Sequence, residues 1–141
     1  MFSRPGLSRV VRGVALPLGV ALLLAACGAG SGRITSGAPA ACAKADASGA
    51  IKLTAKDISF SAPCMQGPAN SPLTIEFTNA DAVPHDVALY TNSSKSQELF
   101  RGELVTGPGK TVTYKLPPLK PGSYFYECTE HPSMTGTLTS S

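Results

Sequence analysis

Apolar and polar residues alternate with a period of two along most of the chain beyond residue 50. The start of this region shows the pattern clearly, because lysine and threonine separate Ile51, Leu53 and Ala55. A period of two is typical of β-strands that bury one face. The alternation predicts strands over residues 51–61, 73–78, 83–91, 111–116, 123–128 and 134–139, and a short or irregular strand over 98–106.

Glycine and proline clusters separate these strands, for example at residues 107–109, 117–118 and 121–122. Such clusters favour turns. No segment carries an apolar repeat of a helical kind over three turns. Seven or eight short strands with regular turn signals predict an all-β fold, specifically an antiparallel Greek-key β-sandwich.

The N-terminal 26 residues have the composition of a targeting signal. Three arginines precede an apolar run over residues 13–26, which is too short for a typical membrane-spanning helix. The run ends in L-A-A-C and resembles the bacterial lipobox, in which the cysteine is lipidated. We therefore predict a lipoprotein signal peptide over residues 1–26 and a lipid anchor on Cys27, with a plain secretory signal as the alternative. The anchor implies an extracytoplasmic protein, held on the outer face of the cell membrane or on the periplasmic side.

Residues 27–48 are rich in glycine, alanine and serine and lack apolar periodicity. They predict a flexible tether between the anchor and a domain over residues 49–141. Loss of residues 1–26 removes three of the twelve basic residues and none of the nine acidic ones, so the remainder is nearly neutral. A neutral chain without a basic face does not fit nucleic-acid binding. The remaining length fits one domain, which we predict to be a monomer.

Three possible metal ligands follow the aromatic strand, with Cys128, His131 and Met134 spaced three residues apart. Thiolate and thioether together favour copper over zinc, calcium or magnesium. A blue-copper site has two histidines and one cysteine in a trigonal plane and a weak axial methionine. The chain has two histidines, so His85 is the candidate for the missing ligand. If their strands are antiparallel neighbours, His85 and Cys128 lie at the same end of the sandwich.

Each of the four cysteines can be assigned a role. With Cys27 assigned to lipid and Cys128 to metal, Cys42 and Cys64 are left over. Two left-over cysteines of an exported protein typically pair. We therefore predict a Cys42–Cys64 disulfide.

The stretch P-G-S-Y-F-Y-E-C-T-E-H-P-S-M-T-G, together with the upstream P-H-D-V, resembles the copper-binding segments of cupredoxins. The C-x-x-H-x-x-M spacing is most similar to that of the amicyanins, whereas plastocyanins have a longer interval between the histidine and the methionine. The resemblance covers residues 50–141 and implies one copper ion with four ligands: His85, Cys128, His131 and, axially, Met134.

The chain departs from this family pattern at Asp86, where many cupredoxins have an asparagine that braces the ligand loop. An aspartate accepts hydrogen bonds and cannot donate them. Asp86 is therefore predicted to accept from the hydroxyl or the backbone of Thr129. The resemblance also implies an electron port at the exposed edge of His131, with Pro84, Pro132 and Val83 as its apolar rim.

These features predict a membrane-anchored carrier of single electrons that cycles between Cu(II) and Cu(I) and serves a redox donor and acceptor. No enzymatic activity is expected, because both histidines are used as ligands and no metal position remains open for substrate. Zinc is disfavoured because structural zinc sites use cysteine and histidine alone. A binuclear copper centre would need a second cysteine where Pro132 stands. The alternative function is a copper-holding or copper-delivery protein, although Met65 is the sole additional ligand candidate in the domain.

Overall fold

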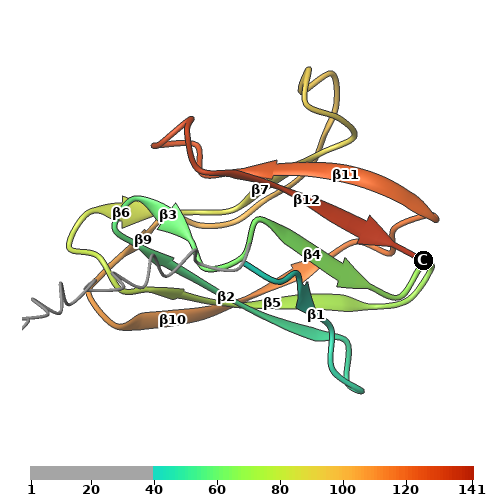
Figure 1. Cartoon of the computed structure of the whole chain (residues 1–141), viewed down its shortest axis with the longest axis horizontal. Coiled ribbons are helices and arrows are strands. Elements are labelled where there is room, and N and C mark those ends of the chain that lie inside the picture. Colours follow the sequence, from blue (N-terminus) through green and yellow to red (C-terminus); the bar gives the residue numbers. More distant parts are fainter. Residues whose placement is uncertain (1–39) are drawn as a thin grey trace, which may run out of the picture. The chain divides into compact units, whose positions relative to one another are not determined.

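Two β-sheets packed face to face form the framework of residues 40–141, which are the residues that this computed structural model describes (Figure 1). The predicted signal peptide, Cys27 and most of the predicted tether lie outside the described residues. The six-stranded sheet has the spatial order β1 (Ala43–Lys44), β4 (Cys64–Gly67), β12 (Thr135–Ser140), β11 (Gly122–Glu127), β7 (Ala88–Tyr90) and β8 (Glu98–Arg101). The four-stranded sheet has the order β10 (Lys110–Leu116), β5 (Leu73–Asn79), β2 (Ala50–Lys56) and β3 (Ser59–Phe60). A small third sheet pairs β6 (Pro84–His85) with β9 (Val105–Thr106).

The predicted all-β sandwich is confirmed, but its sheets are mixed rather than wholly antiparallel. Strand β2 pairs with β5 in parallel, and β4 pairs in parallel with both β12 and β1. The reason lies in the connections: between β2 and β5 the chain crosses to the other sheet to form β4. A strand that returns to its sheet after such an excursion can enter it in the original direction.

The structure corrects several of the predicted segments. Residues 51–61 contain a hairpin of β2 and β3 rather than one strand, and residues 98–106 contain β8 and β9, which belong to different sheets. Residues 83–91 form two short strands, β6 and β7, because the chain leaves one sheet and enters another between His85 and Ala88. Strands β1 and β4 were not predicted, since they are short and lie among prolines, glycines and small residues. Strand β1 falls inside the predicted tether of residues 27–48, so the end of that segment belongs to the sheet.

The core lies between the two large sheets and is formed by the apolar side chains of the alternating strands. Phe77 of β5 stacks on Tyr114 of β10, with ring centroids 5.5 Å apart. Phe60 contacts both Phe77 and Tyr126, at centroid distances of 6.4 Å and 5.3 Å, and so joins the two sheets. Burial of each large apolar side chain contributes about 1.5–3 kcal/mol to stability.

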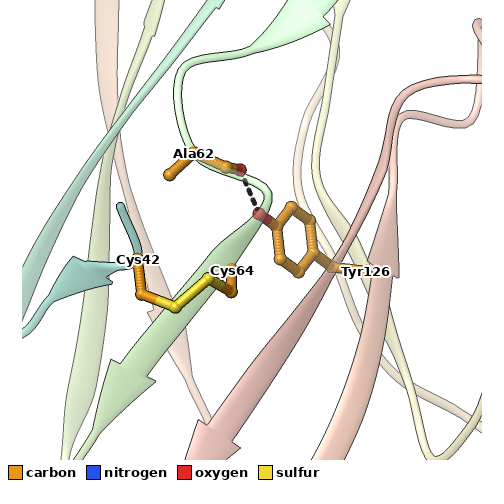
Figure 2. Close-up of a disulfide and its surroundings, with 4 residues drawn as sticks. All are labelled: Cys42, Ala62, Cys64 and Tyr126. Carbon is orange, nitrogen blue, oxygen red and sulfur yellow. Dashed lines mark hydrogen bonds between the residues drawn. A yellow bond between two sulfur atoms is a disulfide. The ribbon is translucent and has the colours of Figure 1, made fainter. Parts of the chain in front are cut away.

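Figure 2 shows two of the links that join the start of β4 and the residues before it to other parts of the sandwich. Cys42 and Cys64 form the predicted disulfide, with their Cα atoms 4.5 Å apart. Tyr126 of β11 donates a hydrogen bond from its hydroxyl to the carbonyl oxygen of Ala62, at 2.6 Å. The tyrosine ring reaches this carbonyl across Gly136 of β12, where any Cβ would collide with the ring.

The end of β11 and the start of β7 lie at the same end of the sandwich. Strands β7 and β11 are antiparallel, with Ala88 opposite Glu127, so β11 ends where β7 begins. Figure 1 shows β6, β9 and the loop between β11 and β12 at this same end. Among the described residues, no helix is long and apolar enough to cross a membrane.

Candidate metal centre

Three possible metal ligands converge at this end of the sandwich: His85, Cys128 and His131. Their ligand atoms all lie within 4.8 Å of one another. The Sγ atom of Cys128 is 3.6 Å from Nδ1 of His85 and 3.6 Å from Nδ1 of His131. The two imidazole rings lie 4.6 Å apart between centroids, inclined at 44°.

Different elements position these side chains. His85 belongs to the short strand β6, which pairs with β9 through the partners His85 and Val105. Cys128 directly follows β11, opposite the start of β7. The strand pattern predicted that His85 begins the strand beside β11, but His85 lies in the separate strand β6, three residues before β7. The structure thus brings together residues 43 positions apart.

The loop from Cys128 to Met134 is closed by its own backbone hydrogen bonds. The N–H of Cys128 donates to the carbonyl of Met134 at 3.0 Å, and the N–H of Met134 donates to the carbonyl of His131 at 2.8 Å. The N–H of His131 donates in turn to the carbonyl of Cys128 at 3.3 Å. Met134 is 2% exposed, so the loop delivers its side chain to the interior, in the same core cluster as Cys128.

The donor geometry fits a trigonal site for a copper ion. Metal–ligand bonds of about 2.0–2.3 Å, set about 120° apart, separate sulfur and nitrogen donors by roughly 3.6 Å. The Cys128–His85 and Cys128–His131 separations match this spacing. Both histidines present Nδ1 to the sulfur, which is the arrangement a shared ion requires.

Burial raises the pKa of the Cys128 thiol, while backbone N–H groups of Asp86, Glu130 and His131 act in the opposite direction. The sulfur is 0% exposed, so water does not stabilise a thiolate here. A bound cation supplies the missing stabilisation and deprotonates a coordinating thiol. The environment of Cys128 therefore suits a metal ligand better than a free thiolate.

Asp86 braces the ligand loop as the sequence predicted. Its carboxylate accepts the backbone N–H of Thr129 at 2.7 Å and the Thr129 hydroxyl at 2.6 Å. Asp86 is 3% exposed, so these two charge-assisted bonds are made in the interior. The residue next to His85 is thereby linked to the residue next to Cys128.

Sequence reasoning missed Asp81, which lies two residues after the end of β5. Its Oδ2 atom lies 2.9 Å from Nε2 of His85, on the side of the ring away from Cys128. Backbone N–H groups of Asp57 and Ile58, and then His85, hold the pKa of Asp81 below its usual value. The sequence offered one signal, an acidic residue four positions before a candidate ligand, but the contact depends on turn geometry that strand periodicity does not reveal.

The residues predicted to form the electron port differ in their exposure to solvent. His85 and Cys128 are fully buried, whereas His131 is partly exposed. Pro132 is exposed and Pro84 is half-buried, and Val83 is 41% exposed. Of the candidate ligands, His131 is therefore the one whose edge reaches solvent.

Comparison with known proteins agrees with this geometry. Residues 17–140 match the cupredoxin-like domain family. Amicyanin of Paracoccus versutus is 35% identical over 65 residues, a match that spans 46% of this chain and 46% of amicyanin, less than half the length of either.

Two solved structures share the fold. The auracyanin of Roseiflexus castenholzii superposes with a TM-score of 0.59 at 17% identity, over 68% of this chain and 99% of that one. Auracyanin A of Chloroflexus aurantiacus, described as a blue copper protein, gives a TM-score of 0.59 at 21% identity, over 65% of this chain and 98% of that one. With the family match over most of its length and a donor set suited to copper, the chain belongs to the cupredoxins, a family of electron-transfer copper proteins whose cofactor is a single copper ion.

Proposed function

We propose that this protein carries single electrons in the bacterial cell envelope, by cycling one copper ion between Cu(II) and Cu(I). In this proposal His85, Cys128 and His131 would hold the copper ion, with Met134 as a fourth and weaker ligand. The observation that carries the proposal is the placement of Cys128 Sγ at 3.6 Å from Nδ1 of both histidines.

The surroundings of the ligands favour electron transfer because they limit movement between oxidation states. His85 is held by β6, and the loop from Cys128 to Met134 is held by its backbone bonds and by Asp86. Ligands fixed before the electron arrives need little rearrangement when the charge changes. Four protein ligands also leave no metal position for a substrate, so we propose that the protein is not an enzyme.

We place the electron port at the edge of His131, with Pro84, Pro132 and Val83 as its rim. Three large apolar side chains are markedly exposed among residues 40–141: Ile58, Val83 and Leu104. Each is linked to the His85 region: Ile58 N–H donates to the Asp81 carboxylate, Val83 lies two residues before His85, and Leu104 precedes the strand partner of His85. Exposed apolar side chains linked to a ligand suit contact with a redox donor and acceptor.

The lipid anchor on Cys27 belongs to the same proposal and would hold the protein to a membrane outside the cytoplasm. The Cys42–Cys64 disulfide supports this location, since disulfides persist in oxidising compartments. Replacement of Cys27 by alanine should release the protein into the soluble fraction. Continued membrane association of that variant would contradict the anchor while leaving the copper site untouched.

Copper storage or delivery is the weaker alternative. Hand-off of a metal needs accessible ligands that can pass it on, but His85, Cys128 and Met134 are buried. Met65, the one other methionine of the domain, is 0% exposed in the core. The burial of these groups favours retention of the ion.

Two rates separate a carrier from a delivery protein. The electron self-exchange rate can be measured by NMR line broadening in mixtures of oxidised and reduced protein, and the copper off-rate by transfer to a chelator. A carrier should exchange electrons rapidly and lose copper slowly. Slow exchange together with rapid copper loss would support delivery instead.

A further inference from the structure

We propose that Asp81 is a positioning residue for the copper site, which fixes the tautomer and the ring orientation of His85 from the side opposite the metal. The part of this inference that concerns copper rests on the proposed function. The part that concerns the histidine can be tested in the metal-free protein.

The two ring nitrogens of His85 face different partners. Nδ1 faces Cys128 Sγ at 3.6 Å, and Nε2 faces Oδ2 of Asp81 at 2.9 Å. An ionised carboxylate can only accept a hydrogen bond, so the Nε2 atom of a neutral ring carries the proton. The lone pair is then on Nδ1, where a metal ligand needs it. Since His85 is 0% exposed, water cannot compete with Asp81 for this bond.

Asp81 is itself held by the turn between β2 and β3. Its Oδ1 atom accepts the N–H of Asp57 at 2.9 Å, and its Oδ2 atom accepts the N–H of Ile58 at 3.1 Å. Its own N–H donates to the side chain of Asn79 at 2.8 Å. The carboxylate therefore has little freedom to turn away from His85.

Asn79 connects Asp81 to the strands around the site. It is 0% exposed, and its amide donates to the carbonyl of Val83 at 2.8 Å and to that of Val105 at 2.7 Å. Val83 lies two residues before His85, and Val105 is the strand partner of His85. Asn79 therefore fixes the backbone just before His85 and the strand that pairs with it, and it also holds Asp81.

The turn that holds Asp81 adopts a conformation that its sequence does not favour. Asp57 and Ile58 have φ angles of 53° and 54°, in a two-residue loop closed by the pair Lys56 and Ser59. Such a loop favours Asn-Gly or Asp-Gly, and a β-branched residue at positive φ is unfavourable. The two hydrogen bonds to Asp81 offset this strain. Strain of this kind is concentrated at functional sites, which supports a role for the turn beyond joining two strands.

The charge of Asp81 has a consequence for the metal. A carboxylate that accepts a bond from a ligating histidine raises the basicity of that ligand. A negative charge close to the site also stabilises Cu(II) more than Cu(I). Asp81 should therefore lower the reduction potential of the site and slow the loss of Cu(II).

Asp46 provides a matched control. It caps the turn between β1 and β2 by accepting the N–H of Ser48 at 2.8 Å, the hydroxyl of Ser48 at 2.6 Å and the N–H of Ala50 at 3.0 Å. This turn lies at the other end of β5, since Ala50 pairs with Thr74 and Ala55 pairs with Asn79. Loss of the Asp46 carboxylate removes a comparable turn cap without touching His85.

The test compares the wild type with Asp81→Asn, Asp81→Glu and Asp46→Asn in the mature protein. Nitrogen-15 NMR of the metal-free protein at about pH 8, where an ordinary imidazole is neutral, reports which nitrogen of His85 carries the proton. The copper-loaded protein then gives the reduction potential and the rate of Cu(II) transfer to a chelator. The wild type should have the proton on Nε2. Asp81→Asn should disturb this tautomer, raise the potential and speed copper loss about 10-fold or more.

Asp81→Glu keeps the charge, so its tautomer, reduction potential and rate of copper loss should lie closer to those of the wild type. Asp46→Asn should change none of the three. A proton on Nδ1 in the wild type would overturn the inference, as would an Asp81→Asn variant with unchanged tautomer and potential. An equal effect of Asp46→Asn would also overturn it. If Asp81→Asn does not fold, Asp81→Glu decides, because its displaced carboxylate should still shift the potential. A wild type that has the proton on Nε2 but takes up no copper would refute the proposed function and leave the positioning of His85 intact.

Discussion

Asp86 accepts two hydrogen bonds from Thr129, one from the backbone N–H at 2.7 Å and one from the hydroxyl at 2.6 Å. The first residue follows His85 in sequence and the second follows Cys128, so the pair joins the two separate segments that supply the ligands. The carboxylate is 3% exposed, and such buried bonds to a charged group contribute more than neutral ones.

Replacement of Asp86 by alanine should therefore lower the free energy of unfolding by about 2–3 kcal/mol, because it leaves two donors of Thr129 without their acceptor. Thr129→Ala retains the backbone bond and should cost only about 1 kcal/mol. Chemical denaturation of the metal-free variants measures both effects. Equal stability of Asp86→Ala and the wild type would show that this pair does not hold the loop.

The hydrogen bond from Tyr126 to Ala62 predicts how stability depends on alkaline pH. Burial raises the pKa of Tyr126, and likewise that of Tyr114, above the usual value for tyrosine. The folded state thus retains protons that the unfolded state begins to release near pH 10. The contribution of these groups should be fully present below about pH 10 and decline as the pH rises further.

Tyr126→Phe should accordingly lose about 1–2 kcal/mol of stability near pH 7, where it leaves the Ala62 carbonyl without its donor. As the pH rises above about 10, the stability of this variant should decline less steeply than that of the wild type, because one buried phenol has been removed. Denaturation at a series of pH values tests both statements. A steeper alkaline decline in Tyr126→Phe would contradict the role assigned to this hydroxyl.

The Cys42–Cys64 disulfide closes a loop with a sequence separation of 22 residues. A double replacement by serine should cost on the order of 3 kcal/mol of stability, through the greater freedom of the unfolded chain. The copper-binding residues are separate from this bridge, so the visible spectrum of the copper-loaded variant should remain that of the wild type. A changed spectrum would mean that the bridge shapes the metal site directly.

The strained turn at Asp57 and Ile58 predicts a stabilising substitution. Asparagine tolerates positive φ far better than isoleucine, and Ile58 is 50% exposed, so little core packing is lost. Ile58→Asn should raise the free energy of unfolding by about 1 kcal/mol. Thermal denaturation can detect this change, and a loss of stability would show that the exposed side chain contributes packing of its own.

Much of the architecture could be predicted because strands with one buried face leave a period of two in the sequence. Strands β5, β10 and β11 match predicted segments to within one residue at either end, and β2 begins one residue before its predicted segment. Strands β1 and β4 left no such signal, because their pairing comes from neighbouring strands and from the disulfide rather than from their own apolar pattern. Pairing across sheets is a long-range property that local periodicity does not contain.

The candidate ligands could be predicted for a different reason. Their residue types are scarce in this chain, so the two histidines and the one cysteine left for metal defined the set before any geometry was known. Asp81 could not be found in this way, because the chain has many acidic residues. Its role arises from a turn 24 residues earlier that fixes its carboxylate beside His85.

The visible spectrum of the protein loaded with Cu(II) tests the central claim most directly. We predict an intense thiolate-to-copper absorption band that disappears on reduction to Cu(I) and is absent from the Cys128→Ser variant. The Cys42→Ser/Cys64→Ser double variant is the matched control and should retain the band. A colourless copper complex, or a band that survives Cys128→Ser, would contradict a blue-copper site at Cys128.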